Sequence, residues 1–187
     1  MNHAGINSVM LKRLQTVDTR LFLSVFGQHE GSKVPTPAHI IRTRVARIAS
    51  FTGDGWLYIT LVPIILLLKP ANAGSLLWTA AFGFSLERVL YFCLKSSFRR
   101  RRPPQSLQGI TSLIEASDEF SLPSGHTSGA FFYVTFLCVG ISPAFLPLYL
   151  WAALVGLSRV ILGVHFPTDI LAGAVMGSSL AVVALVL

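Results

Sequence analysis

Charged side chains are scarce in this chain, and acidic ones are the scarcest. Only 12% of its 187 residues are charged, and 8 aspartates and glutamates are outnumbered by 15 lysines and arginines. Hydrophobic residues make up 52% of the chain, and the mean hydropathy is +0.64. A soluble domain of this size carries more charge on its surface, so the composition excludes that class and predicts an integral membrane protein.

The sequence also lacks several features that would indicate another organisation. We find no internal repeat, no low-complexity tract and no second domain. No clean apolar core with a small-residue cleavage site follows the first basic residues, so the N-terminus is unlike a cleaved signal peptide. The two cysteines, Cys93 and Cys138, lie in apolar stretches, where they behave as small hydrophobic residues. They therefore carry no information about the redox compartment.

The basic excess gives a net charge of +7, which by itself could suggest a nucleic-acid partner. The basic residues, however, flank apolar stretches and do not alternate with exposed aromatic residues. An anionic membrane surface and a phosphorylated substrate explain this distribution better. We therefore expect membrane lipids as partners and no nucleic acid.

Five apolar stretches follow residue 52, and each is a candidate membrane span. They are Trp56 to Leu68, Gly74 to Leu94, His126 to Ile141, Ala144 to Leu162, and Thr168 to Leu187. The first is short as a strictly apolar run and needs flanking residues to reach bilayer thickness. The pattern predicts an all-α integral membrane bundle with about five transmembrane helices.

The first 52 residues differ in kind from the rest. Between Leu11 and Gln28, basic and apolar side chains form an amphipathic pattern, and a second helix with three arginines is predicted from Ala38 to Phe51. A link containing two prolines, residues 31–37, separates them. Neither segment is apolar enough to span. We expect residues 1–52 to form interfacial amphipathic helices and residues 53–187 to form the transmembrane core.

Three short runs carry groups suited to phosphate chemistry. They are Lys95 with Arg102 and Pro103; then Pro123, Ser124, Gly125 and His126; then Ser158 and Arg159, followed by His165 and Asp169. A phosphate ester is an anion that repels a nucleophile, so a site must neutralise its oxygens and align the attacking and leaving atoms. Lys95, Arg102 and Arg159 supply cations for this task, and each arginine can bind two oxygens at once.

Two further features of these runs suit catalysis. Ser124 and Gly125 directly precede an apolar helical run, which places a hydroxyl and backbone N–H groups at a helix N-terminus, a natural site for an anion. His165 and Asp169 are four residues apart, so on a helix they share a face and the carboxylate can fix the imidazole tautomer. This is the arrangement of an activated histidine nucleophile.

In their order and spacing, the three runs resemble the signature of the type 2 phosphatidic acid phosphatase superfamily. That superfamily includes lipid phosphate phosphatases, glucose-6-phosphatase and the vanadium haloperoxidases. Its pattern is a lysine six residues before Arg-Pro, then Pro-Ser-Gly-His, then Ser-Arg, five residues, His, three residues and Asp. Every defined position of the pattern is present in this chain.

The resemblance implies a role for each matching residue. His165 would attack phosphorus to form a phosphohistidine, Asp169 would orient and activate it, and His126 would protonate the leaving oxygen. The phosphoryl oxygens would be bound by the remaining matching residues, which are Lys95, Arg102, Ser124, Gly125 and Arg159. It implies no metal and no cofactor, because fixed cations replace magnesium.

Ordinary structural roles compete with each motif taken alone. A histidine near a helix end is more often a packed or capping residue, and the run Arg99 to Arg102 is more often an interfacial charge belt. By the family spacing Arg102 is the catalytic member of that run, so we expect Arg99 and Arg100 to contact membrane lipid. Ser124 and Asp169 have plain helix-capping as their alternative.

Two charged residues, Glu87 and Arg88, fall inside the second predicted span, where charge is costly unless it is paired or faces the interior. One interpretation is a supporting pair that orients Lys95, which shares a helix face with Arg88. The other is that Arg88 extends toward the interface and Glu87 packs against a polar neighbour. The sequence favours neither.

Chain topology gives an independent check on the site. If each stretch crosses once, the end of the second, the start of the third, the end of the fourth and the start of the fifth emerge on one side. These places carry Lys95, His126, Arg159 and His165. The segment from Pro103 to Leu122 lies on the same side and can cover the site. We expect its acidic residues Glu115, Asp118 and Glu119 to be solvated loop residues rather than ligands.

Two arguments disagree on which membrane face carries the site. Seven basic residues precede Phe51 on the catalytic side, and Lys69 is the single basic residue of the opposite loops. The positive-inside rule then predicts a cytoplasmic site in a multi-pass protein of the cell membrane. The family resemblance implies the opposite, since bacterial members commonly have six spans and an outward-facing site.

These observations predict a phosphatase that hydrolyses a phosphate monoester or diphosphate on a lipid, because a site at the membrane boundary favours an amphiphilic substrate. Phosphatidylglycerol phosphate, phosphatidic acid, lysophosphatidic acid and undecaprenyl diphosphate all remain open, as does the oligomeric state. Two other functions compete with this one. A vanadate-dependent peroxidase is disfavoured because those relatives are soluble, and a non-catalytic lipid-binding scaffold is expected to lose His126, His165 or Asp169.

Overall fold

The computed structural model describes residues 3–27 and 36–187, with side chains from residue 13 onward except that of Pro70. Within these ranges the chain forms helices and no strand, which confirms the predicted all-α class. The link between the two N-terminal helices falls mostly at residues 28–35, outside the described residues.

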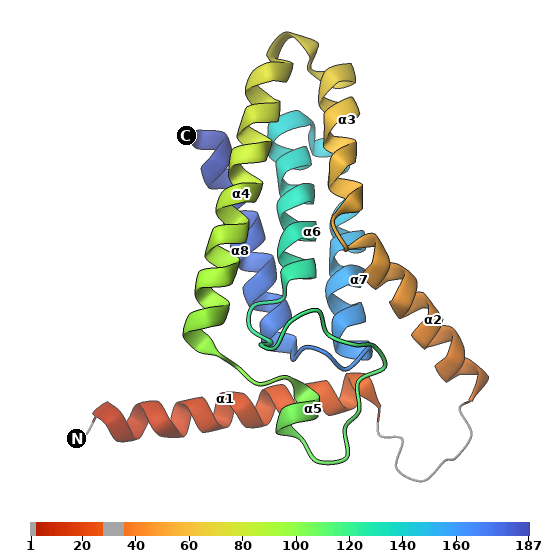
Figure 1. Cartoon of the computed structure of the whole chain (residues 1–187), viewed down its shortest axis with the longest axis vertical. Helices are drawn as coiled ribbons and strands as arrows, with labels where there is room; N and C mark the ends of the chain where they lie inside the picture. The colour runs from red at the N-terminus through yellow and green to blue at the C-terminus, as the bar shows by residue number, and fades with distance from the viewer. Residues whose placement is uncertain (1–2, 28–35) are drawn as a thin grey trace.

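Most of the chain forms a bundle of helices that run roughly side by side (Figure 1). A 3-10 turn, Trp56–Thr60, leads into α3 (Leu61–Leu68), and a second one, Pro70–Asn72, joins α3 to α4 (Ala73–Phe98). The short α5 (Pro103–Ser106) lies in the long connection from α4 to α6. The remaining helices are α6 (Gly125–Phe136), continued by a π turn to Ile141, then α7 (Leu148–Ile161) and α8 (Pro167–Val186), with a 3-10 turn at Pro143–Phe145 before α7.

The central helix α6 packs closely against α8, because glycines of α8 face the backbone of α6. A Cβ atom on Gly173 would lie 2.6 Å from the Ser124 carbonyl oxygen, and one on Gly177 would lie 2.1 Å from that of Ser128. Small residues at such positions allow two helix backbones to approach. The N-terminal ends of α6 and α8 are therefore held next to each other.

Two described helices, Ala73–Ser106 and Pro167–Val186, are long and apolar enough to cross a membrane by themselves. A third span results if Pro37–Thr52 and Trp56–Leu68, which are bent by 50° at their junction, count as one. The helices at Gly125–Ile141 and Leu148–Ile161 are apolar but shorter. The predicted count of five spans thus stays a prediction.

The N-terminal segment forms helices where the amphipathic pattern predicted them, α1 (His3–Phe26) and α2 (Pro37–Thr52). Helix α1 lies across the lower end of the bundle, roughly at right angles to it (Figure 1). Its inner face buries Phe22 and Phe26 against Val160 and Phe166. Its outer face leaves Leu14, Val17 and Leu21 at least half exposed. Such a helix suits a membrane surface, so an interfacial position for residues 1–52 remains our proposal.

Candidate active site

The ends of four bundle helices meet at the lower end of the molecule in Figure 1, as the topology argument predicted. The last turn of α4 carries Lys95, and the last turn of α7 carries Arg159. Ser124 is the N-cap residue of α6, and Asp169 lies in the first turn of α8. The loop between α7 and α8 supplies His165.

Lys95 and Arg102 are both buried, and they share one carboxylate, that of Asp118. The Lys95 ammonium donates to Asp118 Oδ1, and Arg102 Nη2 donates to the same oxygen at 2.7 Å. The interpretation of Asp118 as a solvated loop residue is therefore wrong. A carboxylate is a planar anion that can bind between two cations as a phosphoryl group does, so Asp118 lies where the family resemblance leads us to expect phosphate oxygens.

Two opposing effects act on the pKa of the Asp118 carboxyl. Partial burial raises the pKa of the Asp118 carboxyl, but hydrogen bonds from Lys95, Tyr91 and Arg102 lower this pKa more strongly, to about 2. Tyr91 supplies one of these bonds, from its hydroxyl to Asp118 Oδ2 at 2.7 Å. Asp118 is thus negatively charged at any pH near neutrality.

His165 is almost completely buried, with 2% of its surface exposed, and it lies between Arg102 and Asp169. Arg102 Nη1 lies 3.3 Å from His165 Nε2. This guanidinium nitrogen of Arg102 also donates to the Val164 carbonyl oxygen at 2.7 Å. On the other side, 3.6 Å separates His165 Nδ1 from Asp169 Oδ2, slightly more than a hydrogen bond. Because Arg102 can only donate, His165 Nε2 must be the nitrogen with the free lone pair.

Burial lowers the pKa of His165 to about 4; Asp169 opposes this shift, and the charges of Arg102 and Arg159 add to it. The imidazole is therefore neutral at neutral pH. Its proton then lies on Nδ1, which faces Asp169, and its lone pair lies on Nε2, which faces the cations. This protonation state is the one that a nucleophilic histidine requires.

Asp169 is fully buried, and its oxygens have defined partners. Oδ2 accepts from the Phe166 backbone N–H at 2.8 Å, and Oδ1 accepts from Arg100 Nη1 at 2.7 Å. Its backbone carbonyl accepts from the Ser124 N–H at 3.0 Å. Asp169 therefore connects the start of α8, the start of α6 and the loop that carries His165.

Helix α6 begins where its first residues can approach a ligand closely. Ser124 is buried, and its hydroxyl oxygen accepts from the Thr127 hydroxyl at 2.9 Å. Gly125 packs against the Tyr91 ring, and a Cβ atom there would lie 2.8 Å from Tyr91 Cε2. A side chain at this position would displace the ring that supports Asp118, which gives a physical reason for glycine.

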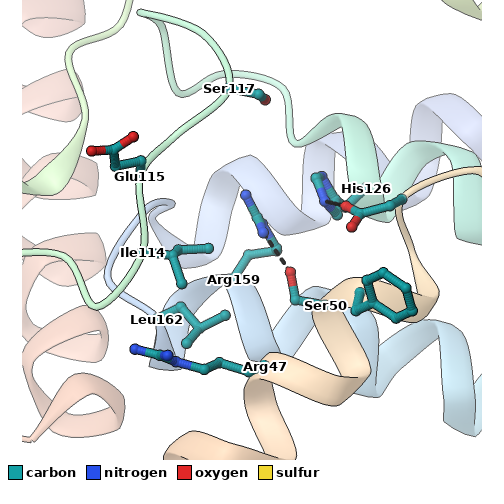
Figure 2. Close-up of a pocket in the computed structure, with 10 residues that line it drawn as sticks. Arg47, Ser50, Ile114, Glu115, Ser117, His126, Arg159 and Leu162 are labelled. Atoms are coloured by element: carbon teal, nitrogen blue, oxygen red, sulfur yellow. Dashed lines mark hydrogen bonds and ion pairs between the residues drawn. The ribbon is translucent and has the colours of Figure 1, made fainter.

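His126 and Arg159 line a cavity of about 260 Å³ between α2, α6, α7 and the loop at residues 114–117. Figure 2 shows Arg159 reaching from α7 toward Ser50 of α2, whose hydroxyl oxygen lies 2.5 Å from Arg159 Nη1. Arg159 is 3% exposed, its Nε has no hydrogen-bond partner, and no described carboxylate forms an ion pair with it. A buried cation in this condition suits an anionic ligand.

His126 Nε2 lies 2.6 Å from Asp54 Oδ1, a residue of the turn before α3. A carboxylate at this distance fixes the orientation of the ring. A second cavity of about 450 Å³ shares Asp54, Ser117 and His126 with the first and extends past Tyr58 and Phe84. His126 therefore lies between a polar cavity and one with aromatic walls.

The structure thus joins five of the predicted residues through direct contacts or a shared partner: Lys95, Arg102, Ser124, His165 and Asp169. His126 and Arg159 share a cavity wall. Sequence reasoning missed the roles of Ser50, Asp54, Asp118 and Arg100, and that of Asp18 in α1, which forms an ion pair with Arg100. The expectation that Arg100 contacts lipid is wrong, since its guanidinium binds Asp169. These residues belong to no motif, and their spacing from the site carries no periodic signal.

The pair Glu87 and Arg88 supports the site from α4. Glu87 is fully buried and accepts from Arg88 Nε at 2.6 Å and from the Ser128 hydroxyl of α6 at 2.5 Å. Arg88 lies over the Tyr91 ring, 4.5 Å from its centroid, and Lys95 approaches the same ring at 4.7 Å. The packing of Glu87 against a polar neighbour is confirmed, and Arg88 reaches Lys95 indirectly, through Tyr91.

Several characterised bacterial proteins are similar in sequence to this chain. It is 34% identical to the bacitracin transport permease protein BcrC of Bacillus licheniformis over 101 residues, 52% of this chain and 48% of that protein. It is 36% identical to phosphatidylglycerophosphatase B of Bacillus subtilis over 105 residues, 50% and 49% of the two chains. The matched region thus spans about half the length of these relatives.

A third relative matches over a longer region. The decaprenylphosphoryl-5-phosphoribose phosphatase of Mycobacterium tuberculosis is 26% identical over 142 residues, 74% of this chain and 76% of that one. It shows that similarity extends upstream of the motifs as well.

Solved structures share the fold over almost the whole chain. The crystal structure of Aquifex aeolicus LpxE superposes with a TM-score of 0.69 at 26% identity, covering 91% of this chain and 96% of that one. A PAP2-type phosphatidylglycerolphosphate phosphatase from Bacillus subtilis superposes with a TM-score of 0.65 at 24% identity, covering 92% and 84%. Residues 73–187, more than half of the chain, also match the sequence profile of the PAP2 superfamily. The chain therefore belongs to the PAP2 superfamily, that of the type 2 phosphatidic acid phosphatases.

Proposed function

We propose that this protein is a membrane lipid phosphatase that hydrolyses a phosphate monoester or diphosphate of a phospholipid or isoprenyl lipid through a phosphohistidine. The observation that carries the proposal is the setting of His165. Its Nε2 lone pair faces the guanidinium of Arg102 at 3.3 Å, and its Nδ1 faces the carboxylate of Asp169. A neutral, oriented imidazole beside phosphate-binding cations is equipped for attack on phosphorus.

In the proposed first step, substrate phosphoryl oxygens replace the Asp118 carboxylate between Lys95 and Arg102. Arg159, Ser124 and the Gly125 N–H complete the set of donors. His165 Nε2 then attacks phosphorus, and the bond between phosphorus and the leaving oxygen breaks as the N–P bond forms. His126 donates a proton to the leaving oxygen, and Asp169 stabilises the positive charge on the imidazole.

In the second step, water attacks the phosphohistidine while His126 takes a proton from it. The N–P bond breaks, inorganic phosphate leaves, and His165 returns to its neutral form. The 2.6 Å contact between His126 Nε2 and Asp54 Oδ1 supports this exchange of roles, because the carboxylate holds the ring in one orientation through both steps. Lys95, Arg102 and Arg159 take the charge-neutralising role of a metal ion.

A lipid substrate is supported by the cavities around His126. The cavity of about 450 Å³ is lined by Tyr58, Phe84 and Tyr91 as well as by His126, so apolar and polar walls meet at the proposed proton donor. An amphiphile places its phosphate at such a boundary and its tail along the aromatic wall. Phosphatidylglycerol phosphate, phosphatidic acid and undecaprenyl diphosphate fit this requirement equally well.

The experiment that tests the proposal is a panel of these lipid phosphates, with released phosphate measured on purified protein and on His165→Ala. Rapid acid-free quenching and mass spectrometry should locate an acid-labile, base-stable phosphate on His165. His165→Ala should lose both turnover and labelling, whereas His126→Ala should still become phosphorylated slowly when the leaving group is good. Label on any other residue, or a requirement for magnesium after EDTA treatment, would contradict the mechanism.

A further inference from the structure

Asp18 of α1 is a buried carboxylate, 2% exposed, on a helix that the sequence predicted to be a membrane-surface segment. Its Oδ1 accepts from the Thr168 N–H at 3.0 Å, and its Oδ2 accepts from the Thr168 hydroxyl at 2.6 Å. Thr168 lies in the first turn of α8, directly before Asp169. The α1 helix is therefore attached by its single buried acid to the element that carries the proposed catalytic carboxylate.

Arg100 connects the two carboxylates directly. Its Nη2 donates to Asp18 Oδ2, and its Nη1 donates to Asp169 Oδ1 at 2.7 Å and to the Thr168 hydroxyl at 2.6 Å. The guanidinium also lies over the Phe166 ring, 4.3 Å from its centroid. One planar cation is thus held on two sides by acids from α1 and α8, with its position set by an aromatic face.

We propose that Asp18 is a positioning residue for catalysis, and that it acts through Arg100 to hold Asp169 in register with His165. The inference rests on the proposed function, since it concerns how the nucleophile of that reaction is held. Through this connection the hydrolytic site depends on α1, a helix that lies outside the residues matching the family profile.

The reason lies in how the charge of Arg100 is shared. A guanidinium that faced Asp169 alone would draw the carboxylate's negative charge away from the imidazole. With Asp18 on its other side, Arg100 is neutralised by a second acid, and Asp169 keeps its charge available to His165. Asp18 thereby affects both the geometry of Asp169 and the electrostatic field at the nucleophile.

The largest contributions to the field at His165 come from charged groups on three elements. The charged groups that face its ring are Asp169 from α8, Arg102 from the start of α5 and Arg159 from α7. Asp18 and Arg100 form the next layer behind Asp169. Changes at Asp18 and at Arg100 alter this field in opposite senses, because one removes a negative charge and the other a positive charge.

The test compares full-length Asp18→Asn and Arg100→Gln with wild type, using phosphatidic acid in detergent micelles as the probe. Losing an outer partner of a metal-binding side chain costs roughly 10- to 100-fold in activity, and we take the lower end of this range for a carboxylate that supports Asp169 through Arg100. We expect kcat of Asp18→Asn to fall about tenfold, with KM changed less than twofold, since the phosphate-binding cations are untouched. The acid limb of kcat/KM should move to lower pH in Asp18→Asn and to higher pH in Arg100→Gln.

Three further variants make the result decisive. Asp18→Glu keeps the charge and should keep the acid limb at its wild-type pH even if its rate falls. Glu119→Gln and Arg101→Gln remove one exposed charge of each sign near the site and should leave the acid limb in place. The pH profile separates an electrostatic role from a folding defect, because a partly unfolded preparation loses rate without moving its pH dependence.

Suppose that the wild-type protein is active. If the acid limb then stays in place in both Asp18→Asn and Arg100→Gln, or moves in the same direction in both, this inference is overturned and the proposed function is left intact. A wild-type protein that releases phosphate from none of the panel lipids would overturn the proposed function, and this inference with it. Opposite shifts with an unchanged KM would support the assignment.

Discussion

At the scale of single residues, Asp118 shows how a loop side chain can compete with a substrate. Its carboxylate binds both Lys95 and Arg102, and its low pKa keeps it charged at any pH near neutrality. Any phosphate that binds these two cations must displace it. The 32% exposure of its side chain indicates that displacement toward solvent is feasible.

We therefore predict that Asp118→Asn binds phosphate-like anions more tightly. The carboxylate is partly exposed, so its competition is worth on the order of 1 kcal/mol, or about fivefold in affinity. The inhibition constant of orthovanadate, measured against lipid phosphate hydrolysis, should fall by this factor. Glu119→Gln, which removes the neighbouring exposed acid, should leave it unchanged. Weaker vanadate inhibition in Asp118→Asn would show that Asp118 helps to hold the cations in place for the substrate.

At the scale of helices, the site depends on how closely α6 and α8 approach. The N-terminal ends of these helices supply Ser124 and Asp169, which are joined by a backbone hydrogen bond of 3.0 Å. Glycines at positions 173 and 177 make that approach feasible, because added Cβ atoms would lie 2.6 Å and 2.1 Å from carbonyl oxygens of α6. Backbone atoms cannot move aside as a flexible side chain can.

Gly177→Ala is accordingly expected to destabilise the protein by roughly 1–3 kcal/mol through overpacking. Thermal unfolding in detergent should report the loss. Gly74→Ala provides a matched control, since a Cβ atom at that position of α4 would meet no atom within 4 Å. It should be neutral or stabilise the helix by up to about 1 kcal/mol. Equal melting temperatures for both variants would mean that α6 and α8 are less closely packed than the structure indicates.

At the scale of the whole molecule, the open question is orientation in the membrane. The proposed catalytic groups and α1 lie at one end of the bundle, and the turn at Pro70–Asn72 lies at the other (Figure 1). Helices α1 and α2 lie toward this proposed catalytic end and carry the basic residues Arg13, Arg20, Arg42, Arg44 and Arg47, whereas Lys69 lies next to the opposite turn. Positive residues near spans resist translocation, so the charge distribution favours a cytoplasmic catalytic end.

Single-cysteine labelling in intact cells can test this orientation at two exposed positions, Gln108 near α5 and Asn72 in the opposite turn. The background should lack Cys93 and Cys138. We expect a membrane-impermeant reagent to modify a cysteine at Asn72 and to spare one at Gln108 until the cells are opened. The reverse pattern would place the catalytic end outside, where lipids of the outer leaflet, such as undecaprenyl diphosphate, become the favoured substrates.

The sequence by itself determined the helical class, the main helices and the order of the motifs, because these are local properties. Apolar stretches predict helices in a membrane. The four-residue spacing of His165 and Asp169 predicted that the two residues meet, and their side chains lie 3.6 Å apart. The expected shared helix face was wrong, because His165 lies in the loop before α8. The alternating direction of successive spans also predicted that the helix ends carrying the motifs lie on one side of the bundle. Those predictions depend on neighbours in the chain, so one sequence suffices to make them.

Only the tertiary structure decided which partners hold the proposed catalytic groups. Asp18 pairs with Arg100 across 82 residues, Asp54 with His126 across 72, and Asp118 with Lys95 across 23. No periodicity links such positions, and a lone acid in an amphipathic helix or a loop is ordinarily solvated. Each becomes a partner because the close packing of the helix ends buries cations there, and a buried cation must find an opposite charge.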